Sequence, residues 1–261
     1  MCGICGIIPL RGATVTPDEI RWEMLTMLRM NQERGEDATG IFRGGDKPLI
    51  VKANIPADKF MSLKDVRDAF NEVTTYLGHT RKATIGSPKN NQNNHPLVYN
   101  NWIVTHNGSI KNTINLPLKD APMVDSFYFT YVFETLGGME KTGDLSRVLS
   151  EIDGTYAIGA YFMPTRTTIL FSDEKEQRRI FYNINEKEGY IRYSQVRDEM
   201  LKYELKPFRL LKVQNGEYQF EHLNPKAPWD IIDAVSSLEG AAETPQEMLE
   251  AVIELLENWD R

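Results

Sequence analysis

The chain has 261 residues, of which 41% are hydrophobic and 26% are charged, and its formal net charge at pH 7 is −7. This composition is typical of a globular protein that is long enough to bury a substantial core. The negative charge argues against a broad surface for nucleic acid or anionic membrane. The run EKEQRR around Arg178 and Arg179 is a minor basic patch, which we interpret as a solvated loop.

Targeting and redox signals are also absent from the sequence. No apolar run reaches the roughly 20 residues that a membrane-spanning helix needs, and the N-terminus lacks the features of a secretory signal. Cys2 and Cys5 provide no disulfide framework, and residues three apart on a strand face opposite sides. The four histidines are scattered without metal-ligand spacing. We therefore expect a cytoplasmic protein with no metal, cofactor, nucleic-acid or membrane partner.

The first half of the chain predicts short strands around one long helix. Thr16, Pro17 and Glu19 are typical of a helix start, because threonine and glutamate can form a capping box there. The helix should end near Gly35, and its apolar stripe consists of Ile20, Met24, Met27 and Leu28. Apolar and β-branched runs predict strands over 2–8, 38–43, 49–53, 75–80 and 102–107.

The second half predicts one helix followed by a series of strands. Residues 123–136 are typical of a helix, with aromatic side chains toward the core. Strands are predicted over 155–162, 167–173, 179–184, 189–194 and 208–213. Strands, then helices, then more strands favour an α+β layered protein over a strict βαβ repeat. We expect one domain over residues 2–223.

Residues 224–261 form a segment of a different kind, a predicted acidic helical tail. Thr244 and Glu247 give a second capping box. The amphipathic stripe that follows consists of Met248, Val252, Leu255 and Trp259. We interpret the tail as a helix that packs on its own domain, and a partner-binding helix is the alternative.

Cys2 is the first residue with chemical potential. Initiator methionine is commonly removed before a small residue, and Cys2 would then carry both a thiol and a free α-amine. The thiolate is a strong nucleophile, and an α-amine with an ordinary pKa of about 7.7 to 8.0 can serve as its general base near neutral pH. Taken alone, Cys2 is equally well explained as a small buried residue in the first strand.

Other residues supply what the hydrolysis of an amino-acid amide requires. Arg81 can bind a carboxylate in bidentate fashion, and Asp125 can pair with an ammonium group. Asn107 and Gly108 can donate a side-chain and a backbone N–H to a developing oxyanion. Each also has an ordinary explanation, since Arg81 could form a surface ion pair, Asn-Gly is a common turn and Asp125 could cap a helix.

The order of these motifs resembles the class II glutamine amidotransferase domain, a member of the N-terminal nucleophile hydrolases. The matching stretches are CGICGI, RGEDATG, GHTRKATIG, NHP, HNGSIKN and the DS at Asp125, with a weaker match through DGTYAIGAYF and IRYSQVRDEML. The resemblance covers roughly residues 2–223. It implies an αββα four-layer sandwich of two antiparallel sheets flanked by helices.

The resemblance also implies roles for single residues. Cys2 would be the nucleophile that forms a glutamyl thioester, and Asn107 with Gly108 would form the oxyanion hole. Arg81 would bind the α-carboxylate of glutamine and Asp125 its α-ammonium. Thr84, in the loop that closes over glutamine, would be a third substrate-binding residue. In RGEDATG, Arg34 and Asp37 would fix the loop beside the first strand, and Gly40 would allow close packing. We interpret His79 and His106 as structural.

The chain departs from the family pattern within the loop that closes over glutamine. Many relatives have an aromatic residue where this chain has Lys82, and some have histidine at the position of Ile85. The resemblance therefore does not imply how this loop closes over the substrate.

The sequence predicts a stand-alone glutaminase that releases glutamate from L-glutamine and passes ammonia to a separate synthase subunit. One alternative is a hydrolase for γ-glutamyl amides of larger metabolites, which would use the same Arg81 and Asp125. The other is a non-catalytic regulatory or interaction module that retains the fold.

Overall fold

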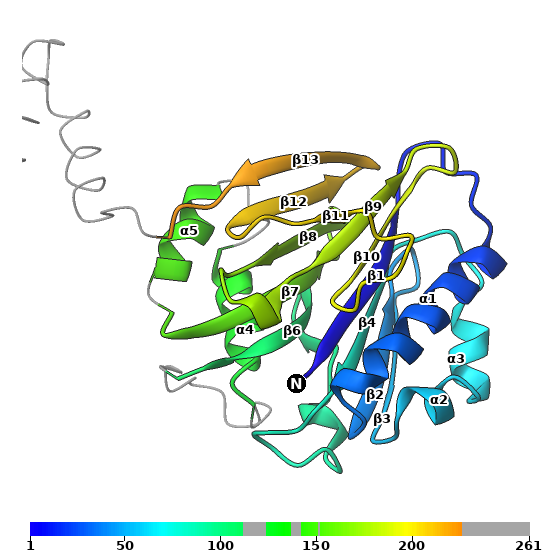
Figure 1. Cartoon of the computed structure of the whole chain (residues 1–261), viewed down its shortest axis with the longest axis horizontal. Coiled ribbons are helices and arrows are strands. Elements are labelled where there is room, and N and C mark those ends of the chain that lie inside the picture. The colour runs from blue at the N-terminus through cyan, green and yellow to red at the C-terminus, as the bar shows by residue number, and fades with distance from the viewer. Residues whose placement is uncertain (112–123, 137–141, 151, 226–261) are drawn as a thin grey trace, which may run out of the picture.

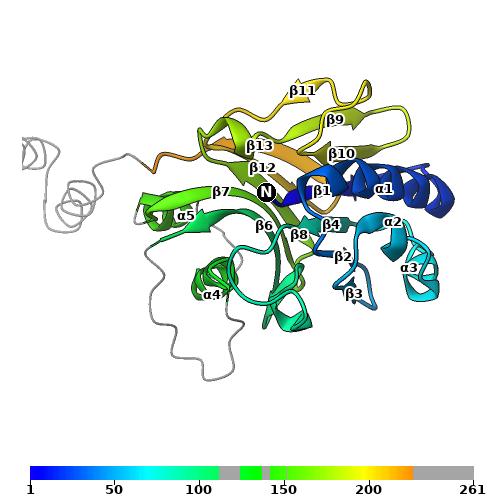
Figure 2. The same ribbon diagram turned by 60° about the horizontal axis from the view of Figure 1, so that its bottom comes forward.

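The computed structural model describes residues 1–111, 124–136, 142–150 and 152–225. These residues form two antiparallel sheets packed face to face, with helices on the outer face of each (Figure 1, Figure 2). The α+β class and the αββα sandwich expected from the sequence are therefore confirmed. The tail helix predicted within 224–261 lies outside the described residues, apart from the first two positions.

The first sheet has β1 at its centre. Its strand order is β11 (Tyr203–Glu204), β9 (Phe181–Asn185), β10 (Tyr190–Ser194), β1 (Gly3–Pro9), β4 (Tyr76–Arg81), β2 (Ala38–Arg43) and β3 (Leu49–Ala53). The helices on its outer face are α1 (Pro17–Asn31), α2 (Ala57–Phe60) and α3 (Lys64–Ala69). A 3₁₀ turn, η1 (Gln32–Arg34), follows α1 directly.

The second sheet has β7 and β8 near its centre. Its strand order is β13 (Glu217–His222), β12 (Arg209–Gln214), β8 (Thr167–Ser172), β7 (Gly154–Phe162), β6 (Trp102–Ile110) and β5 (Leu97–Tyr99). Its outer face is covered by α4 (Phe127–Thr135) and α5 (Thr142–Ser150). Two further 3₁₀ turns, η2 (Asn91–Asn93) and η3 (Glu176–Arg178), lie in connections between strands.

Helix α1 begins and packs as its sequence predicts. The Glu19 amide donates to Thr16 Oγ1 at 3.3 Å, and the Thr16 amide donates to Glu19 Oε2 at 2.7 Å, which completes the capping box. All four residues of the predicted stripe are fully buried: Ile20, Met24, Met27 and Leu28. The predicted strands also form, and within the predicted helix 123–136 the structure has α4 over Phe127–Thr135, while residue 123 lies outside the described residues. The sequence analysis missed α2, α3, α5, β5, β11 and β13, which are short or largely polar.

Alternation along the strands decides which side chains enter the space between the two sheets. In β1, Cys5 and Ile7 pack toward α1, whereas Ile4 and Ile8 belong to the core between the sheets. The same alternation in β6 sends Ile103 between the sheets and Val104 toward α4. Every second side chain of these strands therefore points between the sheets, and those at the neighbouring strand ends lie together at one end of the sandwich. No helix among the described residues has the length and apolarity needed to cross a membrane.

Candidate active site

Cys2 lies immediately before β1, at the end of the first sheet where β4 finishes (Figure 1). The pairing of Gly3 with Thr80, continued by one residue, brings Cys2 opposite Arg81. Arg34 secures this end of the chain, because its Nε donates to the Cys2 carbonyl at 2.9 Å. The expectation that Arg34 fixes the region beside the first strand is thus confirmed. Cys2 and Cys5 are both free thiols.

The Cys2 sulfur lies against the backbone of Lys82. The Lys82 amide donates to Cys2 Sγ at 3.4 Å, and Sγ lies 3.6 Å from the Lys82 carbonyl oxygen. Burial raises the pKa of the Cys2 thiol, and the Lys82 hydrogen bond, the terminal ammonium, Arg81 and Arg178 oppose that increase. Nearby positive charge thus favours the thiolate that nucleophilic chemistry needs.

Arg81 ends β4 with its guanidinium buried between the sheets. Nη1 donates to Asn94 Oδ1 at 2.7 Å, and Nη2 donates to the carbonyls of Ile85 and Gly86 at 2.6 and 2.9 Å. Burial lowers the pKa of Arg81, while the charges of Cys2, Asp37 and Asp125 act against this shift. The guanidinium therefore lies near both the nucleophile and Asp125. In this conformation it holds the loop that follows it in the chain.

The loop 82–86 contains three exposed residues singled out by the sequence, Lys82, Thr84 and Ile85. Asp37 anchors its first part, since its carboxylate accepts from the Ala83 amide at 2.8 Å and lies 3.8 Å from Lys82 Nζ. Asp37 thus ties the RGEDATG segment to the loop that follows β4. Lys82, the departure from the family pattern, thus has a carboxylate partner beside β1.

Asn107 and Gly108 lie within β6 and do not form a turn, so that ordinary explanation of the Asn-Gly pair is wrong. Asn107 is 2% exposed, and its side chain enters the space between the sheets. Gly108 pairs with Tyr156 of β7, and a Cβ at Gly108 would lie only 1.9 Å from the Thr155 carbonyl oxygen. Only glycine therefore fits beside Asn107 without moving a central strand.

Gln195 joins the strand of the nucleophile to the strand of Asn107. Its Oε1 accepts from Asn107 Nδ2 at 2.8 Å and from the Ile4 amide at 3.2 Å. Gln195 follows β10, and its own amide donates to the Ile4 carbonyl at 3.1 Å. One buried side chain thus fixes the two sheets relative to each other where the predicted catalytic residues meet. The sequence analysis quoted this residue without assigning it a role.

Asp125 precedes α4, and its carboxylate is oriented by two backbone amides. Oδ2 accepts from the Ile110 amide at 2.8 Å, and Oδ1 accepts from the Ser126 amide at 3.0 Å. The N-cap of α4 is Ser126, so Asp125 does not occupy the cap position that its ordinary explanation required. Its contact with Ile110 instead ties it to the end of β6, three residues after Asn107.

Three of the four histidines, which are far apart in the sequence, lie close together in the fold. The His79 and His95 rings stack with centroids 4.1 Å apart, and His79 Nε2 donates to the His106 carbonyl at 3.0 Å. His106 Nδ1 lies 2.7 Å from Ser126 Oγ. Burial lowers the pKa of His79 to about 3 and that of His106 to about 4, and it places the pKa of His95 well below 6.5. The three rings are therefore neutral at pH 7 and support the backbone on either side of the site.

Close packing in this region also requires Gly40, as expected. A Cβ there would lie 2.1 Å from the His95 carbonyl oxygen. The neighbouring Lys52 donates to the carbonyls of Asn94 and Pro96 at 2.7 and 3.1 Å. Gly40 and Lys52 thus hold the 94–96 segment, whose Asn94 contacts Arg81, against the first sheet.

Arg178 is the residue near the site that the sequence analysis misjudged. Its guanidinium is half-buried and donates to Asn107 Oδ1 at 3.1 Å, whereas Arg179 remains exposed. The interpretation of this charge run as a solvated loop is therefore wrong for Arg178. Sequence spacing gave no signal, because 71 residues separate the two partners.

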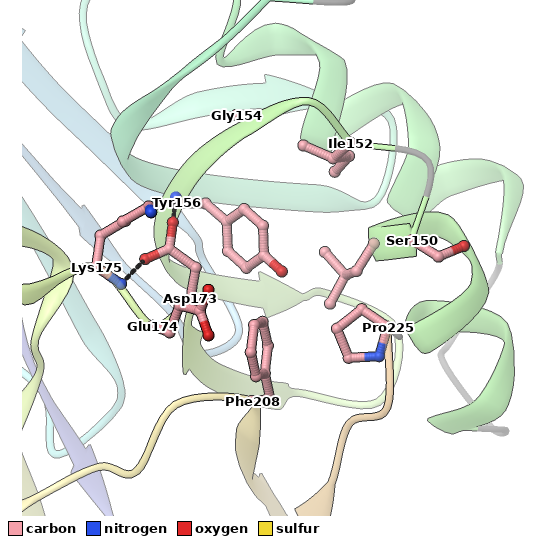
Figure 3. Close-up of a pocket in the computed structure, with 10 residues that line it drawn as sticks. Ser150, Ile152, Gly154, Tyr156, Asp173, Glu174, Lys175, Phe208 and Pro225 are labelled. Atoms are coloured by element: carbon pink, nitrogen blue, oxygen red, sulfur yellow. Dashed lines mark hydrogen bonds between the residues drawn. The ribbon is translucent and has the colours of Figure 1, made fainter. Parts of the chain in front are cut away.

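A separate pocket of about 210 Å³ lies beyond β7 and contains none of the predicted site residues (Figure 3). Its walls include Ile152, Tyr156, Phe208 and Pro225, and Asp173 lies at its rim. The Asp173 carboxylate accepts from the backbone amides of Tyr156 and Lys175 at 2.6 and 2.8 Å. This pocket is distinct from the group of residues around Cys2.

Comparison with known proteins connects this geometry to a family, although no family model matches the chain. The enzyme named glutamine–fructose-6-phosphate aminotransferase [isomerizing] of Bacillus subtilis is 29% identical over 184 residues. That alignment covers 67% of this chain and 29% of the relative. The chain thus matches less than a third of the length of that relative.

Two solved structures share the fold. The allosteric regulatory enzyme of purine biosynthesis superimposes with a TM-score of 0.68 at 18% identity, covering 85% of this chain and 49% of that one. The glutamine aminotransferase class-II domain protein of Silicibacter pomeroyi gives a TM-score of 0.56 at 15% identity, covering 87% of this chain and 100% of that one.

The two facing antiparallel sheets, with Cys2 directly before the central strand β1, form the fold that the chain shares with these two structures. The chain is thus similar in sequence to a glutamine-dependent aminotransferase and in fold to a glutamine aminotransferase class-II domain protein.

Proposed function

We propose that this chain hydrolyses the side-chain amide of L-glutamine, with Cys2 as nucleophile after removal of Met1. The observation that carries the proposal is the convergence of Cys2, Arg81, Asn107 and Asp125 at one end of the sandwich. They come from four separate segments of the chain: the position directly before β1, the end of β4, β6 and the residues before α4. Sequence similarity to the glutamine-dependent relative of Bacillus subtilis supports the same chemistry.

The Cys2 sulfur attacks the amide carbon of glutamine, and its proton passes to the α-amine that Met1 removal exposes. Asn107 Nδ2 and the Gly108 amide stabilise the resulting oxyanion. When the carbon–nitrogen bond breaks, the α-ammonium returns the proton to the leaving group, which departs as ammonia. Water then attacks the thioester, releases glutamate and restores the thiol.

Arg81 and Asp125 bind the amino-acid end of the substrate. Charge supports this division, because the guanidinium can pair with the α-carboxylate and the Asp125 carboxylate with the α-ammonium. Arg81 currently donates to the carbonyls of Ile85 and Gly86, so a carboxylate would replace those carbonyls as its partner. Thr84 belongs to the loop that moves in this exchange.

We further propose that the ammonia is passed to a separate acceptor enzyme. The name of the Bacillus subtilis relative couples glutamine to an acceptor, fructose 6-phosphate, which supports a transfer role in this family. The acceptor for this chain would be identified by an increase in glutamine turnover when the two proteins are mixed.

The decisive test measures glutamate release from L-glutamine by protein whose loss of Met1 is verified by intact mass. Wild type should be active, Cys2→Ala should have no measurable turnover, and Cys5→Ala should remain active because Cys5 packs against α1. Parallel assays with γ-glutamyl amides would reveal a preference for a larger leaving group. Wild-type protein that releases no glutamate from glutamine, alone or with a partner, would refute the proposed function.

A further inference from the structure

Arg178 makes a set of contacts that a surface charge would not need. It ends η3, between β8 and β9, and its Nη1 donates to Asn107 Oδ1 at 3.1 Å. Its Nε and Nη2 both donate to Thr155 Oγ1 at 3.1 Å, so the guanidinium plane is fixed against β7. Burial lowers the pKa of Arg178, and the nearby charges of Asp173 and Cys2 oppose that shift. The guanidinium keeps its positive charge beside the nucleophile.

These contacts fix the orientation of the Asn107 amide. An arginine can only donate hydrogen bonds, so the Asn107 atom facing Arg178 must be the oxygen. At the other end, Gln195 Oε1 must accept, because it also faces the Ile4 backbone amide, which can only donate. A flipped Asn107 amide would set its NH₂ group against the guanidinium and its oxygen against Gln195 Oε1.

The fixed orientation has a consequence for chemistry. Asn107 Nδ2 has two hydrogens, and one is directed at Gln195 Oε1. The other is the one available to an oxyanion. A hydrogen bond from a cation to Oδ1 also polarises the amide and makes its remaining N–H a stronger donor.

We propose that Arg178 is a positioning residue, which locks and polarises the Asn107 amide so that its remaining N–H is directed at the oxyanion. This inference rests on the proposed function. The negative charge of Asp173, one of the residues that line the pocket in Figure 3, favours the charged form of Arg178.

The position of Arg178 near Cys2 allows a second, independent measurement, the pH at which the Cys2 thiol ionises. The charged groups that face Cys2 are the terminal ammonium, Arg34 from η1, Arg81 from β4 and Arg178 from η3. Removing one of these cations makes the thiolate less favourable and increases the pH at which the thiol ionises. That pH is measured from the rate of alkylation by iodoacetamide and requires no substrate.

The test uses Met1-free protein with three substitutions: Arg178→Met, Arg178→Lys and the matched control Arg179→Met. Arg179 pairs with Glu204 at 3.3 Å and is exposed. We expect Arg178→Met to lower kcat for glutamine by about 10- to 100-fold, less than the loss of the oxyanion donor itself, with KM changed less than about threefold. Its alkylation midpoint should move to higher pH.

The other two variants separate charge from geometry. Arg178→Lys should keep the wild-type alkylation midpoint but recover kcat only in part, because it retains the charge and loses the fork. Arg179→Met should match wild type in both assays. The inference is overturned if folded Arg178→Met keeps kcat within about twofold of wild type, or if its only defect is an increased KM. Wild type that is alkylated at Cys2 but releases no glutamate would instead refute the proposed function.

Discussion

The two halves of the candidate active site are built on different kinds of support. Asn107 and Gly108 lie inside a strand of the second sheet, and Asn107 is fixed at both ends by Arg178 and Gln195. Arg81 leads into the exposed loop 82–86 and binds the carbonyls of that same loop. Under the proposed function, the strand half would be oriented for an oxyanion before substrate arrives, whereas the loop half would have to exchange partners. We therefore expect the first half to govern kcat and the second to govern KM.

Loss of the Asn107 amide should give the largest effect among these tests. Asn107→Ala removes one oxyanion donor, which typically costs about 100- to 1000-fold in kcat. KM should change little, because the donor acts mainly on the transition state. Steady-state kinetics with glutamine would measure both. Asn101→Ala is the matched control and should remain active. Asn101 directly precedes β6, at the end far from Asn107, and its side chain donates to Glu134.

Arg81→Lys should have the next largest effect, and this effect should fall on KM instead of kcat. The substitution keeps the charge but loses the bidentate fork, so we expect KM for glutamine to increase about tenfold or more with kcat within about threefold. Arg11→Lys, at an exposed ion pair with Glu217, is the control. A large loss in kcat with unchanged KM would contradict the division between the two halves.

Acid should lower the stability of the fold around Asn107, because buried histidines support the backbone there. Folded His79 has a pKa of about 3 and folded His106 one of about 4, both below the unfolded value of about 6.5. The unfolded chain therefore binds more protons between these values, and stability is lost as the pH falls from about 6.5 toward 3. Urea midpoints at pH 7, 5.5 and 4.5 should fall in that order.

Variants test whether the buried rings cause this acid dependence. His79→Gln retains a donor for the His106 carbonyl but cannot be protonated in this range, so it should flatten the dependence. His222→Asn changes an exposed histidine and should leave it unaltered. Equal slopes in all three proteins would show that other groups dominate.

Lys82→Met should give the smallest effect. The Lys82–Asp37 pair spans 3.8 Å and its lysine is largely exposed, and such surface pairs contribute little. Because Asp37 also accepts from the Ala83 amide, the loop keeps its main anchor. We expect a change in KM of about twofold or less in glutamine kinetics. A tenfold change would show that the lysine itself meets the substrate.

Local sequence was sufficient for α1 and for most strands, and for particular physical reasons. The capping residues of α1 act within one turn, and its stripe repeats at helical spacing, so both are readable without a partner. The short α2 and the largely polar β13 carry no such repeat, and their formation depends on contacts with neighbouring elements. The turn predicted as one explanation for Asn-Gly is absent because β7 pairs with β6 through both residues.

The sequence by itself determined the chemical groups of the site: a thiol at position 2, the arginine of GHTRKATIG, the amide of HNG and the carboxylate before α4. Only the tertiary structure decided what surrounds them. Arg178 and Gln195 reach Asn107 from distant parts of the chain, and His79 reaches the neighbouring His106 carbonyl from β4. No local pattern records such contacts. Hydrogen-bond orientation and burial depend on which surfaces meet, and these are set when the two sheets pack.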